Sequence, residues 1–337
     1  MFLHRLKALK TAVLQTAYRT VPLPWWSTLA NAPVLMPLYH LVSDESVPHV
    51  RHLYIHRTVR EFERDLDFIL KSFEPVGLDV VCGFLDRPSR RQHRCFHLTF
   101  DDGFREQYEI VAPLLLRKGV PASFYLATSF LDNASMAHRN KVSLLIERLT
   151  TQISPDTKEE IRAVVGAESP ADVVSKMLRI PRSERDRVDE IARILEFDIG
   201  GYLRTQRPYL TTEQVRALRG HGFAIGAHSC DHPFYGDIPL DEQLSQTRKS
   251  MELTAKITGE PVRAFAFPFS SKGVTPDFFD ALFNERHIKL ALDTGGLARH
   301  FHPRCLPRVI MEQGGRTASE ILTSDFVRAA KSRGRFG

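Results

Sequence analysis

Short runs of apolar residues alternate along the chain with stretches in which apolar residues recur every three or four positions. The runs are nearly continuous, as in strands buried on both faces, and their alternation with amphipathic helices is typical of a parallel sheet covered by helices. So many repeats of this unit favour a closed or nearly closed barrel over an open sheet. We expect strands at 34–40, 95–100, 122–128, 223–228, 263–267 and 289–293, and helices at 58–73, 105–119, 211–222, 240–259 and 275–285.

Capping signals mark the ends of two of these helices. Thr58 and Glu61 form a T-x-x-E capping box at the start of 58–73, and Gly119 ends 105–119. The first helix also carries an apolar stripe that would face the sheet, formed by Val59, Phe62, Leu66, Ile69 and Phe73.

Residues 138–208 interrupt the alternation with charged, helix-rich sequence. Two Ser-Pro pairs, at 154–155 and 169–170, each place a capping serine before a proline at the first helical position. We interpret the region as an all-helical insertion between two barrel strands, which either decorates the fold or forms a lid or partner site beside the strand ends. The expected organisation is an N-terminal segment 1–33, a barrel made of 34–137 and 209–315, the insertion 138–208, and a C-terminal helix with a basic tail, 316–337.

Composition excludes some classes of partner. The 337 residues contain 46 Lys and Arg against 40 Asp and Glu, a formal charge of +6. The basic residues are dispersed and no nucleic-acid-binding motif accompanies them, so we expect no nucleic-acid partner. An anionic substrate or membrane surface would explain the excess equally well. The cysteines are far apart and form no C-x-x-C pair, which indicates reduced structural thiols in a cytoplasmic protein: Cys82, Cys95, Cys230 and Cys305.

The N-terminal segment is basic and amphipathic. Basic residues interrupt it every few positions, so it has the pattern of neither a secretory signal nor a membrane span. A helix would gather apolar residues near one face, ahead of Trp25 and Trp26: Phe2, Leu6, Leu9, Val13 and Ala17. Two interpretations remain. The helix packs across one end of the barrel, or it docks a cytoplasmic enzyme on the inner leaflet of an anionic membrane.

Polar and titratable side chains end or follow several of the expected strands. The carboxyl ends of parallel strands meet at one rim of a barrel, where the chemistry of such folds takes place. Several titratable residues from separate strands at one rim are difficult to explain by packing alone. The residues at this rim are His40, Asp101 with Asp102, His228 with His232, Phe269 and Asp293.

Two histidines and one carboxylate form a hydrolytic metal set that leaves positions open for water and substrate. His228 and His232 would supply two nitrogens, and one aspartate of the Asp101–Asp102 pair would supply an oxygen. A cation would also offset the repulsion between the adjacent carboxylates. The other aspartate is then free to accept a proton from the attacking water. An H-x-x-x-H spacing alone is weak in a chain with 14 histidines, but the aspartate pair strengthens it.

TFDDG at 99–103 and HSCDH at 228–232 resemble the first two motifs of the NodB-type polysaccharide deacetylases, the fourth carbohydrate-esterase family. The resemblance covers roughly residues 34–137 and 209–311. It implies the distorted (β/α) barrel of that family, here with a helical insertion. It also implies that Asp101 is the general base, that Asp102, His228 and His232 bind the metal, and that the Gly103 amide helps to bind the developing oxyanion.

The sequence departs from the family pattern in two places. The third motif reads AFAFPFS, with Ala266 in place of an arginine, as in the F-A-[FY]-P-[FY] variant of poly-N-acetylglucosamine deacetylases and their relatives. We assign Phe269 and Arg308 to substrate binding, with the alternative that Arg308 supplies the missing cation near Asp101.

The family's last motif, a leucine three residues before a histidine, is absent from the C-terminal region. LYH at 38–40 resembles that element in permuted members, which nominates His40 as general acid, against the alternative of a structural histidine. Asp293 orients a catalytic histidine or binds sugar.

We therefore expect a hydrolase that acts on carbon–nitrogen bonds other than peptide bonds. It would remove N-acyl, chiefly N-acetyl, groups from amino sugars of a poly-, oligo- or lipid-linked saccharide, with metal-bound water as nucleophile. Zinc is the expected divalent metal, and the ligand set would also accept cobalt, nickel or iron. The alternatives are an inactive barrel that binds carbohydrate, and an amidase or esterase with a non-polysaccharide substrate.

Overall fold

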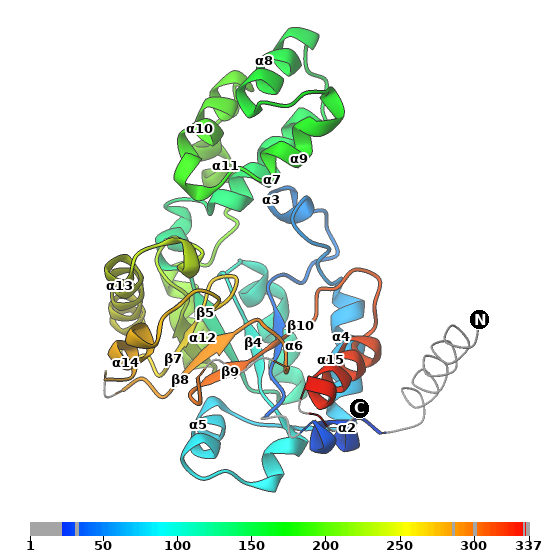
Figure 1. The fold of residues 1–337 in the computed structure, drawn as a ribbon, viewed down its shortest axis with the longest axis vertical. Helices are drawn as coiled ribbons and strands as arrows, with labels where there is room; N and C mark the ends of the chain where they lie inside the picture. The colour runs from blue at the N-terminus through cyan, green and yellow to red at the C-terminus, as the bar shows by residue number, and fades with distance from the viewer. Residues whose placement is uncertain (1–21, 31–33, 285–286, 299–301, 333, 335–337) are drawn as a thin grey trace, which may run out of the picture.

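A parallel barrel forms the centre of the computed structural model, which describes residues 22–30, 34–284, 287–298, 302–332 and 334. Eight parallel strands lie in the order β10-β1-β4-β5-β6-β7-β8-β9, surrounded by helices (Figure 1). The strands are β1 (Pro37–Tyr39), β4 (Leu98–Phe100), β5 (Ala122–Leu126), β6 (Ala224–Ala227), β7 (Ala264–Ala266), β8 (Leu290–Asp293), β9 (Cys305–Pro307) and β10 (Val309–Ile310). A separate pair joins β2 (Glu74–Pro75) to β3 (Cys95–Phe96).

The barrel is nearly closed by one extended segment. β9 pairs with β8, β10 pairs with β1, and only Arg308 separates the two strands. Its backbone N–H donates to the carbonyl of Asp293, whereas the next N–H, of Val309, donates to Met36 on the opposite edge. The predicted distorted (β/α) barrel is confirmed. The sequence pattern predicts every strand of the sheet except β9 and β10.

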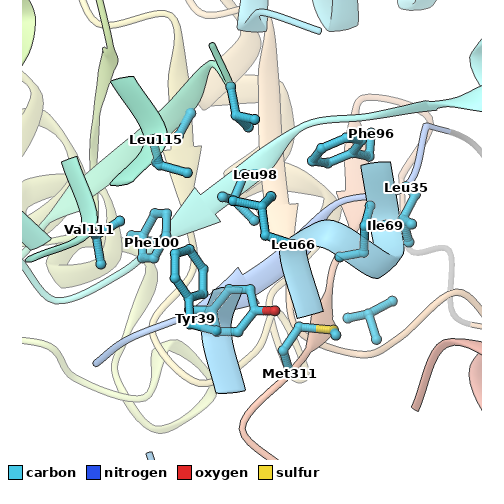
Figure 2. Packing of buried hydrophobic residues seen from close by; sticks show 14 of the residues in the cluster. Leu35, Tyr39, Leu66, Ile69, Phe96, Leu98, Phe100, Val111, Leu115 and Met311 are labelled. Carbon is cyan, nitrogen blue, oxygen red and sulfur yellow. The ribbon is translucent and has the colours of Figure 1, made fainter. Parts of the chain in front are cut away.

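Successive strand residues face opposite sides of the sheet, and both sides are buried. Leu98 and Phe100 of β4 face outward and pack with Leu66 and Ile69 of α4 (Val59–Leu70), as Figure 2 shows. On the inner side, Leu290 and Leu292 of β8 share a cluster with Ala264, Ala266 and Leu306. Burial on both sides explains why the strands read as continuous apolar runs.

The outer helices follow the predicted pattern. Thr58 caps α4 through the full capping box with Glu61, and Gly119 ends α6 in the left-handed conformation, at φ 64°. The region 105–119 begins as a π-helical turn at Gln107–Val111 before α6. The outer helices are α2 (Leu23–Leu29), α3 (Pro48–Arg51), α6 (Ala112–Lys118), α12 (Thr212–Gly220), α13 (Leu240–Thr258), α14 (Pro276–Asn284) and α15 (Ala318–Ser332).

One helix that the pattern does not predict, α5 (Leu78–Asp86), closes the amino end of the barrel. Its Leu78, Val81 and Cys82 side chains belong to the inner cluster. Figure 1 shows α5 at the end opposite the insertion, so only the carboxyl ends of the strands face the insertion.

Residues 138–206 form a helical unit that projects from that carboxyl end (Figure 1). It has a core of its own, to which Leu145, Ile161 and Ile191 contribute. Asn140 and Ser143 of its first helix donate to the carbonyls of His49 and Pro48 in α3, and thereby join the unit to the loop after β1. Its helices are α7 (His138–Leu149), α8 (Pro155–Val165), α9 (Val173–Met177), α10 (Arg185–Ile194) and α11 (Ile199–Gln206).

Among the described residues, no helix is long and apolar enough to cross a membrane. Short 3₁₀ turns complete the secondary structure. The turns cover Arg90–Arg94, Thr128–Asn133, Pro170–Asp172, Arg182–Glu184 and Tyr235–Asp237. The predicted helix after the second Ser-Pro pair therefore begins as a 3₁₀ turn. The four cysteines are free thiols. The predicted amphipathic helix of the N-terminal segment lies outside the described residues, and only α2, which follows it in the sequence, is described.

Candidate active site

A cavity of about 350 Å³ opens at the carboxyl end of the barrel. The structure brings His40, Asp101, Asp102, His228 and His232 together in its wall, from the ends of three strands. The loop after β1, the insertion and the residues that flank it supply most of the remaining wall: Leu53, Tyr54, Ala137, Arg139, Asn140 and Tyr209. Phe130, Phe269, Thr294 and Ile310 complete it.

Asp102, His228 and His232 face one another with ligand atoms that all lie within 4.8 Å. Oδ1 of Asp102 lies 3.4 Å from Nε2 of His228 and 3.2 Å from Nε2 of His232. Although this oxygen is buried, no hydrogen bond satisfies it. The three atoms converge on one point, as ligands of a cation do.

The tautomer of His228 strengthens this fit. Its Nδ1 lies 2.8 Å from the carbonyl oxygen of Ala266, and because that oxygen can only accept, Nδ1 carries the proton. In the neutral ring, Nε2 then presents a lone pair toward Oδ1 of Asp102, so that two acceptors face each other. A second-shell carbonyl that fixes the ligating nitrogen is typical of metal-bound histidine. Two imidazoles and a carboxylate suit a divalent transition metal.

Backbone strain is concentrated at this rim. Asp102, Ser229 and His232 have positive φ angles of 72°, 66° and 58°, which non-glycine residues seldom adopt. Gly103 follows at 73° without strain, because glycine lacks a Cβ. Strained residues of this kind persist where the surrounding structure holds them, typically at functional sites. Here the turns aim the Asp102 and His232 side chains at the same point.

Asp101 lies beside the metal set in a different environment. Arg308 donates to both of its carboxylate oxygens at 2.6 Å, and both side chains are almost completely buried. Burial would raise the pKa of Asp101, but the Arg308 charge outweighs it and lowers the pKa below the usual value. Asp101 is therefore ionised at neutral pH, with Oδ2 3.7 Å from Nε2 of His228.

The structure corrects the prediction that Arg308 binds substrate. Its side chain is fully buried inside the barrel and does not reach the cavity wall, because both arms of the guanidinium are bound to Asp101. The alternative interpretation, a cation that replaces the missing arginine near Asp101, matches the observed geometry.

His40 faces the cavity from the end of β1 and is held from behind by Glu312. Nδ1 of His40 lies 2.5 Å from Oε2 of Glu312, whose Oε1 accepts from the backbone N–H groups of His40 and Leu41. Burial alone would lower the pKa of His40, but the Glu312 carboxylate reverses this and raises it to about 9. The ring is therefore protonated at neutral pH and can donate from Nε2.

The structure also corrects the prediction for Asp293, which contacts neither the cavity nor a histidine of the site. It is 2% exposed, and its carboxylate accepts from the backbone N–H groups of Ser271 and Gly295. It thereby holds the loop after β7. That loop carries Phe269, which does line the cavity, is 39% exposed and lies 4.6 Å from the His232 ring, centroid to centroid.

Several residues of the site are not predicted from the sequence. Glu312 follows β10 as His40 follows β1, so the same strand-end rule would identify it once that short strand is recognised. Gln107, in the π-helical turn, donates to the carbonyls of His40 and Asp101 and ties their two strands together. Tyr54 lies in the loop after β1 and Arg139 lies in the insertion. No local sequence pattern identifies either as a residue of the cavity.

Comparison with known proteins decides the family. The family model of polysaccharide deacetylase matches residues 89–284. The chain belongs to the polysaccharide deacetylase family. The matched range includes both aspartates and both histidines of the site. No curated protein matches the chain.

Solved deacetylases share the fold of this family member. The chain is similar to the Streptococcus pyogenes deacetylase PplD in complex with acetate, with 14% identity, 87% of this chain and 98% of that chain covered, and a TM-score of 0.56. It is similar to IcaB from Ammonifex degensii, with 15% identity, coverage of 89% and 97%, and a TM-score of 0.53. It is also similar to a de-N-acetylase from Aggregatibacter actinomycetemcomitans, with 14% identity, 87% of this chain and 99% of that chain covered, and a TM-score of 0.53.

The family establishes the class of reaction. This deacetylase is a hydrolase that acts on carbon–nitrogen bonds other than peptide bonds, as the sequence predicts. At 14–15% identity, the similar structures support only the barrel fold. Substrate and mechanism must therefore be argued from the residues of the site.

Proposed function

We propose that the protein removes N-acyl groups, chiefly N-acetyl, from amino sugars of a poly-, oligo- or lipid-linked saccharide, in a reaction that depends on a divalent metal. The observation that carries this proposal is the convergence of three groups on one cavity. They are the set Asp102, His228 and His232, the ionised Asp101, and the protonated His40.

Asp102, His228 and His232 would hold the metal, with zinc as the expected ion and cobalt, nickel or iron as alternatives. When bound, a divalent metal polarises the amide carbonyl and lowers the pKa of a coordinated water. The orphaned oxygen of Asp102 and the fixed tautomer of His228 are the features of this chain that support the assignment.

Asp101 and His40 divide the proton transfers. Asp101, as the general base, would accept the proton of the attacking water, because Arg308 keeps it ionised and its Oδ2 lies 3.7 Å from Nε2 of His228. His40, as the general acid, donates a proton to the leaving amine nitrogen, and its pairing with Glu312 keeps it charged at neutral pH. The arrangement has a base that is deprotonated and an acid that is protonated over the same pH range.

The sugar would lie against Phe269. This ring is exposed in the cavity, although its backbone adopts a positive φ of 57°, and it packs against His232. An exposed aromatic face held in a strained turn beside metal ligands supports a role as a platform for the saccharide ring.

Metal analysis of variants tests the proposal. His228→Ala and His232→Ala should lose the metal and acetate release from N-acetylated saccharides together, because each removes one ligand. His221→Ala, an exposed histidine outside the cavity, is the matched control and should lose neither. Full metal occupancy in a variant that carries both His228→Ala and His232→Ala would contradict the ligand assignment. Acetate release only from O-acetylated saccharides would move the activity to ester bonds.

Cytoplasmic location and peripheral contact with an anionic membrane remain proposals. The basic segment on which they rest lies outside the described residues. Within them, Trp25 of α2 is 67% exposed whereas Trp26 is buried. A solvent-exposed tryptophan next to a basic segment supports an interfacial position.

A further inference from the structure

Arg139 places a positive charge without a partner in the wall of the cavity. It follows the first residue of α7, at the start of the insertion, where it lines the cavity and is exposed to solvent. Among the described residues, no carboxylate pairs with its guanidinium. The one contact found is with Phe269, at 5.9 Å from the guanidinium carbon to the ring centroid. That distance is at the outer limit of a cation–π interaction, so most of the hydrogen-bonding capacity of the guanidinium remains available.

The other charged groups of the cavity already have roles in the site. Asp101 is bound to Arg308, His40 is bound to Glu312, and Asp102 belongs to the proposed metal set with His228 and His232. Partial desolvation at the cavity wall lowers the pKa of Arg139 from its usual value, and no anion opposes this effect. The guanidinium is therefore free to pair with an oxyanion of a substrate in the cavity.

The position of Arg139 relative to the reaction centre is set by two ring contacts. The guanidinium lies over Phe269, and Phe269 lies against His232, with ring centroids 4.6 Å apart. Phe269 therefore contacts both Arg139 and a residue of the metal set. A sugar ring stacked on Phe269 would bring its own substituent, or the next unit of the saccharide, within reach of the guanidinium.

We infer that the preferred substrate is a saccharide that carries an oxyanion, a phosphate or a carboxylate, close to the N-acylated sugar, and that Arg139 binds this group. The inference rests on the proposed function for the identity of the reacting sugar and adds the charge of the substrate to it. A guanidinium is suited to both oxyanions, because its planar donors form paired hydrogen bonds with each. Because Arg139 belongs to α7, this contact would give the insertion a role in substrate selection.

Binding by full-length, zinc-loaded protein tests the inference, with three probes compared by titration calorimetry. N-acetylglucosamine 1-phosphate carries phosphate, an N-acetylglucosamine–glucuronate disaccharide carries carboxylate, and di-N-acetylchitobiose is neutral. We expect at least one anionic probe to bind roughly tenfold or more tightly than the neutral one. Arg139→Gln should remove that preference, and Arg139→Lys should keep part of it, because the charge remains. Comparing the phosphate with the carboxylate identifies the anion.

Arg193→Gln is the matched control, because it makes the same change of charge at an exposed arginine of the insertion. It should leave all three affinities unchanged. Equal affinity for charged and neutral probes, no binding of the anionic probes at millimolar concentration, or an equal loss for all probes in Arg139→Gln would each overturn the inference. Metal-dependent acetate release without any preference for the anionic probes would refute the inference alone, whereas metal-independent release would count against the proposed function.

Discussion

Replacing Glu312 with glutamine should move the alkaline limit of activity toward acid pH. The rise of the pKa of His40 from 6.5 to about 9 corresponds to about 3 kcal/mol of preference for the protonated ring. Glutamine keeps an oxygen that can accept from the backbone N–H groups of His40 and Leu41, but it turns an amide donor toward Nδ1 and removes the negative charge. The desolvation of the ring is then no longer outweighed, and the pKa should fall to 6.5 or below. Near pH 8 the protonated fraction of His40, and with it the rate, should fall about 30-fold or more, and by a much smaller factor near pH 6.

The assay is the pH profile of kcat/KM for acetate release by zinc-loaded Glu312→Gln, with metal content measured in parallel. Zinc should be retained, because Glu312 is not a ligand. Glu147→Gln is the matched control, because Glu147 also pairs with a histidine, His52, at 2.8 Å, outside the cavity. Its profile should equal that of the unmodified protein. An alkaline limb that stays near pH 9 in Glu312→Gln would refute either the role of His40 as acid or that of Glu312 in holding its proton.

Three further predictions concern the base, the stability and the N-terminus. Asp101→Asn should retain the metal and lose about two powers of ten or more in rate, whereas Asp102→Asn should lose the metal; identical behaviour of the two variants in metal analysis and acetate release would contradict the division of roles. His40 should contribute about 3 kcal/mol of stability that is fully present below pH 6.5 and is lost as the pH rises through about 9. Urea unfolding at several pH values should show this loss in the unmodified protein and not in His40→Gln. Full-length protein should sediment with anionic liposomes more strongly than a variant that begins at Ala32, and equal sedimentation would exclude the segment as an anchor.

The sequence predicts those parts of the fold that local patterns determine. Strands buried on both faces appear as continuous apolar runs, and α4 begins where its capping box places it. The segment that closes the barrel escapes prediction, because β9 and β10 are short and Pro307 and Arg308 interrupt their apolar pattern. α5 escapes because it follows no strand of the barrel and packs across its end.

The same distinction applies to the site. Asp101, Asp102 and His228 can be found because each follows a recognisable strand. Roles that depend on packing cannot be read in this way. Asp293 ends a strand as the others do, yet its carboxylate turns to backbone N–H groups. Arg139 reaches the cavity only because α7 packs on the loop after β1.

Dependence of acetate release on added metal tests the central claim most directly. Protein stripped with a chelator, then dialysed free of it, would be titrated with Zn²⁺ while acetate release from an N-acetylated oligosaccharide is measured. Asp102, His228 and His232 form one site in the described part of the chain. We therefore predict no release without metal and full release at one equivalent. Undiminished release by the stripped protein would contradict the account, and so would a His232→Ala variant that one equivalent restores to the same rate.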